Sequence, residues 1–206
     1  MKVNILLSTY NGEQFLAEQV KSIQEQTYQE WELLIRDDGS SDGTVEVIKQ
    51  LVAKDPRIHF INENHVENVG VIKSFHALLK YSKADLYCFS DQDDFWLPEK
   101  ISLQVTEAKK YSQDKPLLIY TDLKVVDENL SVLHDSMIRT QSDHANTELI
   151  QELTENTVTG GVAMINHALA ELWTGEEKYD LLMHDWYLGL LASAFGNLVY
   201  IDEPTE

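Results

Sequence analysis

The first half of this sequence alternates between short strand-like runs and segments with helical periodicity, and this alternation constrains the fold most. The strand-like runs are Val3–Ser8, Trp31–Asp37, Ile58–Asn62, Asp85–Ser90 and Leu117–Thr121. The helical segments are Glu13–Gln26, Thr44–Ala53, Val69–Tyr81 and one that can begin at Pro98 and continues from Leu103 to Tyr111. This βαβαβ order predicts an α/β fold with a mostly parallel sheet covered by helices on both faces.

After about residue 122 the alternation is lost. The stretch Val125–Asn156 is polar and irregular, and we expect a loop at Ser136–Asn146 and a short helix near Thr147–Leu153. Further strands are predicted at Val162–Ile165 and Leu198–Ile201, and helices near Ala168–Trp173 and Met183–Phe195. Because no repeat or Pro/Gly-rich linker interrupts the chain, we expect one domain over residues 1–206 with a specialised second half.

Composition and charge limit the partners of such a domain. The 206 residues include one cysteine, Cys88, so no internal disulfide is expected, and no apolar run reaches the length of a membrane-spanning helix. The N-terminus lacks the features of a signal peptide, and we expect a cytoplasmic protein. With 16 basic and 35 acidic residues, the net charge of −19 disfavours binding to nucleic acid or anionic lipid. An acidic protein that handles a diphosphate needs a cation to mediate the contact.

Three polar clusters follow three of the predicted strands: Ser8–Gly12, Asp37–Gly43 and Asp91–Asp94. Each cluster alone could be an ordinary turn, because Asp, Asn, Ser and Gly are the common turn residues. In open parallel sheets, however, ligands bind beyond the carboxyl ends of the strands. The convergence of all three clusters on that edge predicts a ligand site there.

The acidic cluster is the most specific of the three. Asp91, Asp93 and Asp94 would repel one another at a buried strand end unless something compensated their charge. Magnesium or manganese, held by one or two carboxylates and by substrate phosphates, would do so. The alternative is an acidic helix start ahead of Pro98, which accounts for Asp94 but not for Asp91.

Two common classes of nucleotide site are missing from the sequence. The first strand is not followed by Gly-x-Gly-x-x-Gly, which argues against a dinucleotide oxidoreductase, and the chain has no Gly-x-x-x-x-Gly-Lys-Ser/Thr phosphate loop. A nucleotide would have to be held in another way.

Three ordered segments resemble the successive signatures of family 2 glycosyltransferases, which have the GT-A fold. They are Val3–Asn11, Asp37–Thr44 and Phe89–Lys100, and the similarity covers residues 3–105 closely and extends more loosely to residue 202. Asn68–Phe75 and Ser90–Trp96 resemble the bacterial rhamnosyltransferase branch. The resemblance implies a Rossmann-like GT-A domain whose residues 1–122 bind the nucleotide sugar and whose residues 123–206 form the acceptor side.

The resemblance also implies roles for single residues on the donor side. Thr9 and Tyr10 would border the base, and Asp38 would accept a hydrogen bond from the pyrimidine ring NH. Asp93 would ligate Mn²⁺ or Mg²⁺ on the diphosphate, with Asp91 near the ribose and the metal. The full implied donor set is Thr9, Tyr10, Asn11, Asp38, Asn68, Lys73, Asp91 and Gln92. For Lys73, a surface place on an amphipathic helix is an equal alternative.

On the acceptor side, Gly160 and Gly161 resemble the family's segment facing the acceptor, although a plain turn before the next strand is equally compatible with them. His184-Asp185-Trp186 resembles the family's acidic pair, in which the aspartate is the general base. Asp185 could instead be a helix N-terminal aspartate. His184 could orient the acceptor or be a structural histidine.

The implied function is inverting transfer of a sugar to a hydroxyl of a saccharide or lipid-linked saccharide, in bacterial cell-surface polysaccharide synthesis. The expected donor is dTDP-L-rhamnose, with a UDP-hexose as the alternative. A nucleotidyltransferase and a non-catalytic sugar-nucleotide-binding module remain open. A peripheral place at the inner face of the membrane is compatible with this function. Because family members continue beyond Ile201–Pro204 into further helices, the resemblance also implies a truncated catalytic domain.

Overall fold

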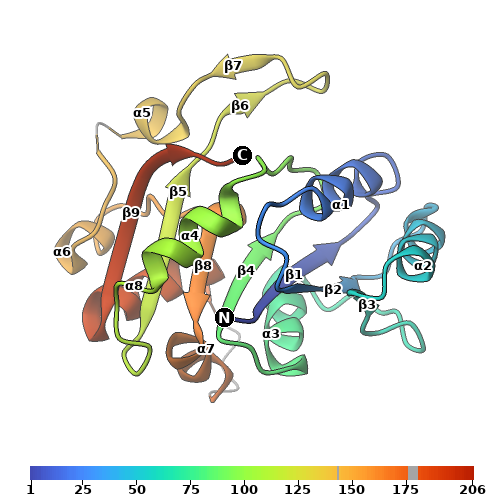
Figure 1. Cartoon of the computed structure of the whole chain (residues 1–206), viewed down its shortest axis with the longest axis horizontal. Helices are drawn as coiled ribbons and strands as arrows, with labels where there is room; N and C mark the ends of the chain where they lie inside the picture. The colour runs from blue at the N-terminus through green and yellow to red at the C-terminus, as the bar shows by residue number, and fades with distance from the viewer. Residues whose placement is uncertain (143, 176–180) are drawn as a thin grey trace.

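The computed structural model describes residues 1–142, 144–175 and 181–206. In these residues, a seven-stranded sheet with the order β3-β2-β1-β4-β8-β5-β9 is covered by helices on both faces (Figure 1). The strands of this sheet are β1 (Val3–Thr9), β2 (Trp31–Asp37), β3 (Ile58–Phe60), β4 (Leu86–Ser90), β5 (Leu117–Asp122), β8 (Ala163–Asn166) and β9 (Asn197–Pro204). The predicted α/β fold is confirmed.

The sheet is mostly parallel, as the sequence predicts. Strands β1, β2, β3 and β4 run parallel to their neighbours, and β5 runs parallel to β9. The exception is β8, which is inserted between β4 and β5 and is antiparallel to both. A strand from the second half of the chain therefore joins the two parallel parts of the sheet and brings its flanking segments beside the end of β4.

Side chains alternate between two cores on either face of the sheet. Along β1, Val3, Ile5 and Leu7 pack into one core, whereas Leu6 packs into the other. The first core is covered by α1 (Leu16–Gln24), α2 (Thr44–Lys54) and α4 (Lys100–Ala108), and the second by α3 (Val71–Tyr81), α7 (His167–Thr174) and α8 (His184–Phe195). Because both faces are buried, these strands are apolar throughout instead of alternating with polar residues.

The stretch Val125–Asn156 is more regular than the sequence suggests. It contains a two-stranded hairpin of β6 (Val125–Val126) and β7 (Val132–His134), and the short helices α5 (Met137–Gln141) and α6 (Leu149–Glu152). Helix α5 lies inside the segment predicted to be a loop, Ser136–Asn146, of which residue 143 lies outside the described residues. Ser136 accounts for this helix, because its Oγ accepts a hydrogen bond from the backbone NH of Arg139 at 3.0 Å.

Several predicted boundaries shift by a few residues. The helix predicted from Glu13 begins at Leu16, because the chain first makes a turn in which the Phe15 NH bonds the Gly12 carbonyl at 3.1 Å. The helix predicted from Val69 begins at Val71, after Gly70 with φ of 84°. The last strand is longer than predicted, Asn197–Pro204. In the part of the chain that the structure describes, no helix has the length and apolarity needed to cross a bilayer.

Candidate functional site

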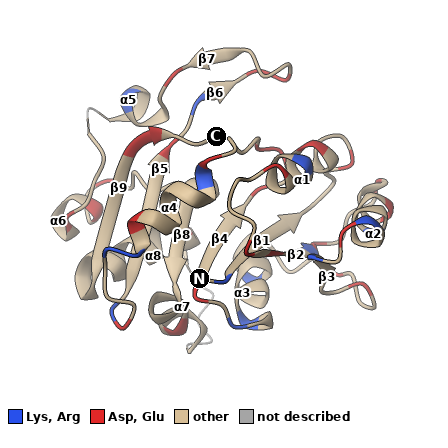
Figure 2. Cartoon of the chain, viewed as in Figure 1, with Lys and Arg blue, Asp and Glu red and all other residues tan. Residues whose placement is uncertain are grey.

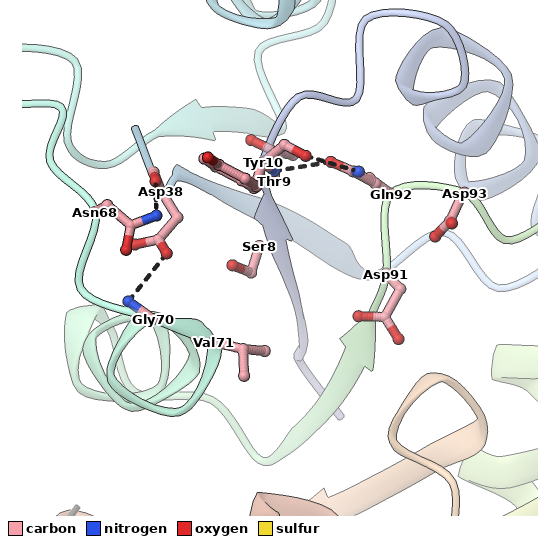
Figure 3. Close-up of a pocket in the computed structure, with 10 residues that line it drawn as sticks. All are labelled: Ser8, Thr9, Tyr10, Asp38, Asn68, Gly70, Val71, Asp91, Gln92 and Asp93. Atoms are coloured by element: carbon pink, nitrogen blue, oxygen red, sulfur yellow. Dashed lines mark hydrogen bonds between the residues drawn. The ribbon is translucent and has the colours of Figure 1, made fainter. Parts of the chain in front are cut away.

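The strand register brings the three polar clusters together. Thr9 at the end of β1 is paired with Asp37 of β2, and Leu7 is paired with Ser90 at the end of β4. The chain leaves all three strands at the same edge of the sheet, where a cavity of about 300 Å³ opens (Figure 3). Its lining residues are Ser8, Thr9, Tyr10, Asp38, Asn68, Gly70, Val71, Asp91, Gln92 and Asp93.

Asp37 organises the loop that follows β2. Its Oδ1 accepts the backbone NH groups of Gly39 at 3.1 Å and Ser40 at 2.9 Å, and its Oδ2 accepts the Thr9 hydroxyl at 3.0 Å. Gly39 has φ of 86°, and a Cβ at this position would lie 3.0 Å from the backbone nitrogen of Asn68. Only glycine fits this conformation and this close approach without strain. The loop is therefore held tightly against the segment before α3.

Asp38 faces the cavity as part of a buried ion pair. Its Oδ1 lies 2.7 Å from Arg36 Nη1 and accepts the Val69 NH at 2.7 Å, while its Oδ2 accepts the Gly70 NH at 3.0 Å. The side chains of Arg36 and Asp38 are only 6% and 7% exposed. A carboxylate oxygen accepts two hydrogen bonds, so Oδ2 retains one acceptor position for a ligand.

Gln92 holds the other wall of the cavity in place. Its side-chain amide pairs with the backbone of Tyr10: Tyr10 NH donates to Gln92 Oε1 at 2.8 Å, and Gln92 Nε2 donates to the Tyr10 carbonyl at 3.0 Å (Figure 3). These bonds fix the loop after β1 to the loop after β4. Tyr10 itself is 53% exposed, so its ring is available as a surface on which a base can stack.

Not every predicted donor residue lines this cavity. Asn11, with φ of 51°, uses its Oδ1 to accept the Ser41 NH at 2.8 Å and so fixes the loop after β2. Asn68 lines the cavity, and its Nδ2 donates to the Asp38 carbonyl at 2.8 Å. Lys73 lines a separate cavity of about 550 Å³ together with Arg36 and His76. Lys73 is thus absent from the lining of the donor cavity and lines a neighbouring one.

Asp91 and Asp93 provide carboxylates at the end of β4. Burial on the floor of the site raises the pKa of Asp91 to about 7, with further contributions from the charges of Asp94, Asp93 and Asp185. The residue is exposed where it lines the cavity, whereas the protein around its carboxyl group keeps part of the water away (Figure 3). Carboxylates whose negative charges destabilise one another in this way can bind a divalent cation, and the cation would favour their ionised forms.

Among the described residues, no group of three or more His, Cys, Asp and Glu side chains is arranged to enclose a metal ion. The protein side of a cation site at Asp91 and Asp93 is thus incomplete without substrate oxygens. Incomplete protein ligation is typical of Mg²⁺ and Mn²⁺ sites in which one or two carboxylates bind the cation together with substrate phosphates.

Asp185 lies at the start of α8, beside the turn that precedes β8. This turn is the 3₁₀ segment η1 (Gly160–Val162), and the Gly160 NH donates to Asp185 Oδ2 at 3.2 Å. The Trp186 NH donates to Oδ1 at 2.6 Å. Burial raises the pKa of the Asp185 carboxyl above its usual range, partly offset by these two hydrogen bonds. Asp185 of α8 is therefore a neighbour of the two glycines, Gly160 and Gly161.

His184 is buried in an aromatic environment. Its ring stacks on Trp173 at 5.9 Å and an interplanar angle of 12°, and it lies 4.7 Å from Phe75 and 5.0 Å from Phe89 between ring centroids. Neither ring nitrogen has a hydrogen-bond partner among the described residues, and burial lowers the pKa of the imidazole to about 4. His184 is therefore neutral at physiological pH. A Cβ on Gly160 would lie 3.2 Å from its Nε2.

Sequence reasoning missed two buried groups near the site. Glu152 of α6 is fully buried, and burial together with the charge of Asp185 raises its pKa to about 7. Lys100, at the start of α4, is fully buried against Glu206. Nothing in the local sequence distinguishes these residues from surface charges, because their partners are distant in the chain.

Comparison with known proteins agrees with this geometry. The family model described as glycosyl transferase family 2 matches residues 4–171. A dTDP-rhamnosyl transferase, RfbG, from Shigella flexneri is 27% identical over 97% of this chain and 69% of its own length. A UDP-Glc:alpha-D-GlcNAc-diphosphoundecaprenol beta-1,3-glucosyltransferase, WfgD, from Escherichia coli is 30% identical over 62% of this chain. The match covers 47% of that relative, so it spans about half of its length.

Solved structures show the same fold. The crystal structure of residues 1–349 of TarS from S. aureus superposes on all of this chain and on 59% of its own with a TM-score of 0.74 at 18% identity. A mannosyltransferase from Pyrobaculum calidifontis, solved with GDP-Man and Mn²⁺, superposes on 98% of this chain and 55% of its own with a TM-score of 0.73 at 16% identity. Together with the family match over most of the sequence, this GT-A architecture shows that the chain belongs to glycosyl transferase family 2.

Proposed function

We propose that this chain is a metal-dependent, inverting glycosyltransferase that moves a sugar from a nucleoside diphosphate donor to a hydroxyl group. One observation carries the proposal: the turn η1 contacts both sides of the site, because the Gly160 NH donates to Asp185 Oδ2 at 3.2 Å and a Cβ on neighbouring Gly161 would lie 2.8 Å from Asp94 Oδ2. The candidate base on α8 and the acids of the donor cavity therefore belong to one site. A site that joins a nucleotide cavity to a second carboxylate fits group transfer better than binding alone.

The residues of the donor side have separate roles in the proposed reaction. Asp38, fixed by Arg36 and two backbone NH groups, accepts the ring NH of a pyrimidine base. Asp91 and Asp93 would hold Mn²⁺ or Mg²⁺, which would supply Lewis-acid stabilisation of the leaving diphosphate. Gln92 and Asn11 keep the surrounding loops in place through their backbone contacts.

Asp185 acts on the acceptor. The acceptor oxygen attacks the anomeric carbon and forms the new glycosidic bond while the bond from that carbon to the diphosphate oxygen breaks on the opposite side, with inversion. Asp185 takes the proton of the acceptor hydroxyl as this bond forms. The raised pKa of Asp185 makes it a stronger base than an exposed aspartate. The absence of side chains at Gly160 and Gly161 leaves room for neutral His184 beside Gly160 and for Asp94 beside Gly161.

The proposed donor is dTDP-L-rhamnose. The similarity to a dTDP-rhamnosyl transferase over 97% of the chain supports it, and the similarity to a UDP-glucose-dependent enzyme makes a UDP-hexose the alternative. Asp38 would accept the ring NH of thymine and uracil equally. Discrimination must come from contacts with the thymine methyl group and from the presence or absence of a partner for the ribose 2′-hydroxyl.

The proposed acceptor is a saccharide or lipid-linked saccharide used in bacterial cell-surface polysaccharide synthesis. The name of the Escherichia coli relative includes a sugar linked to diphosphoundecaprenol, which supports an acceptor of this kind. Such a reaction would take place at the inner face of the membrane, with the catalytic domain on the cytoplasmic side.

Release of nucleoside diphosphate tests the proposal. The purified protein is incubated with manganese, dTDP-L-rhamnose or UDP-glucose, and a panel of saccharide and lipid-linked acceptors. We expect acceptor-dependent release of dTDP or UDP together with a glycosylated product. Tight binding of the donor with no acceptor-dependent release for any panel member would instead favour a non-catalytic binding module.

A further inference from the structure

Lys100 is a fully buried cation next to the acidic end of β4. Its Nζ lies 2.9 Å from Glu206 Oε1 and 3.3 Å from Thr205 Oγ1, and it lies 4.7 Å from the centroid of the buried Trp96 ring. Figure 2 shows the basic start of α4 beside the C-terminal end of the chain. Burying an ammonium group is unfavourable unless it is paired, so its surroundings must be arranged around it.

A second carboxylate, that of Asp94, belongs to the same buried cluster. A Cβ on Gly161 would lie 2.8 Å from Asp94 Oδ2 and 3.1 Å from Glu206 Oε2, so both carboxylates border one point of the η1 backbone. In the part of the chain that the structure describes, Asp94 Oδ2 is buried without a hydrogen-bond partner. The cluster therefore contains two carboxylates and one ammonium group: Lys100 is ion-paired with Glu206, and Glu206 and Asp94 both border Gly161.

We propose that Lys100 is a positioning residue, which holds Asp94 and Glu206 together beneath the loop after β4 and so fixes Asp93 toward the donor cavity. This role rests on the proposed function, because it concerns the segment that would carry the metal. The three segments joined by the cluster are the loop after β4, the acceptor-side turn at Gly161 and the end of β9. The ammonium group would thereby couple the donor side and the acceptor side of the site.

Asp93 and Asp94 are adjacent, so a change in the position of Asp94 changes the direction in which Asp93 points. Asp93 is exposed in the cavity, and none of the hydrogen bonds found among the described residues holds its carboxylate. Its orientation must come from the backbone, and the adjacent Asp94 side chain is packed against Gly161.

The test uses three variants of Lys100 and Glu206. Lys100→Met removes the cation but leaves a buried carboxylate, so we expect a clear drop in melting temperature. Lys100→Met combined with Glu206→Gln removes the ion pair and leaves one carboxylate of the cluster, that of Asp94, so we expect the melting temperature to recover in part. In this double variant, the manganese concentration for half-saturation, followed by EPR spectroscopy with and without dTDP, should rise about tenfold. Lys109→Met, which removes an exposed lysine after the same helix, is the matched control.

The outcomes separate a positioning role from a structural one. A stable double variant with unchanged manganese half-saturation overturns the proposal, because Lys100 then serves stability alone. If the double variant does not fold, Glu206→Gln decides. It retains Lys100 beside Asp94 and should bind manganese within about threefold of the unmutated protein, and a tenfold loss would overturn the proposal. Failure of the unmutated protein to bind any nucleoside diphosphate contradicts the proposed function instead.

Discussion

The backbone NH of Gly160 donates to Asp185 Oδ2 at 3.2 Å, and this bond joins the turn before β8 to the start of α8. The two residues are 25 positions apart and come from motifs that the sequence singles out separately. Their contact fixes one oxygen of the carboxylate, while the Trp186 NH binds the other at 2.6 Å. Each oxygen keeps one acceptor position, so the carboxylate is oriented and still able to receive a proton.

Replacing Asp185 by Asn tests its role as the base. The amide has nearly the same shape but cannot take the proton, so we expect transfer to fall by about 100-fold or more while the affinity for the donor is unchanged. Sugar transfer and donor binding are measured on the same preparations. Asp202→Asn is the control, because Asp202 is an exposed aspartate whose contacts are with exposed Arg139 and with the Tyr200 hydroxyl. Near-normal transfer by the Asp185→Asn variant would show that another residue is the base.

The two glycines of η1 should give different phenotypes when each is changed to alanine. A Cβ at Gly161 would lie 2.8 Å from Asp94 Oδ2, which is too close without movement, so Gly161→Ala should lower stability by about 1–3 kcal/mol and weaken manganese binding. A Cβ at Gly160 would lie 3.2 Å from His184 Nε2, on the acceptor side. We expect Gly160→Ala to reduce transfer while retaining manganese affinity. Thermal unfolding and manganese titration of both variants check this split, and identical profiles would contradict it.

Asp38 should contribute to the stability of the folded protein as well as to binding of the donor. In Asp38→Ala the Arg36 guanidinium loses its carboxylate partner inside the protein, so we expect a loss of about 3–5 kcal/mol. Asp38→Asn keeps an oxygen that can accept from Arg36 and the Val69 NH, and the loss should be clearly smaller. Urea unfolding of both variants measures the difference. Equal losses would mean that the negative charge, and not the acceptor oxygen, is what Arg36 requires.

Glu152 should make the stability fall as the pH rises. Its pKa is about 7 in the folded protein, above the usual value for glutamate, so the folded state retains a proton that the unfolded chain has lost. Stability should therefore decrease between about pH 4.5 and pH 7. Glu152→Gln removes this penalty and should be more stable at pH 8 by on the order of 1–3 kcal/mol, with the difference vanishing near pH 4. Glu155→Gln, at an exposed position nearby, should show no such trend.

Much of the donor side can be predicted from the sequence, because it is built from local motifs at strand ends. Thr9, Asp38, Asp91 and Asp93 each follow an apolar run, and the parallel register brings those ends together. Lys73 shows the limit of such reasoning. It lies in a motif that resembles the family, but its position on α3 places it at a different cavity.

The acceptor side depends on contacts that local patterns do not encode. The insertion of β8 between β4 and β5 sets the position of Gly160 and Gly161, and no periodicity in the sequence specifies that order. Glu152 and Lys100 look like ordinary surface charges until the fold buries them beside partners far along the chain. The hairpin of β6 and β7 is also too short to produce a recognisable alternation. The division near residue 122 and the extent of the domain stay predictions.

Calorimetric titration of the unmutated protein with dTDP-L-rhamnose, in manganese and in a chelator, tests the central claim most directly. Asp93 faces the donor cavity, and its carboxylate needs a cation to bind a diphosphate. We predict binding in manganese that weakens at least tenfold in the chelator, and the same weak binding for Asp93→Ala in either condition. UDP-glucose should bind less tightly than dTDP-L-rhamnose. Equal affinity of the unmutated protein for the donor with and without the metal would contradict this account of the site.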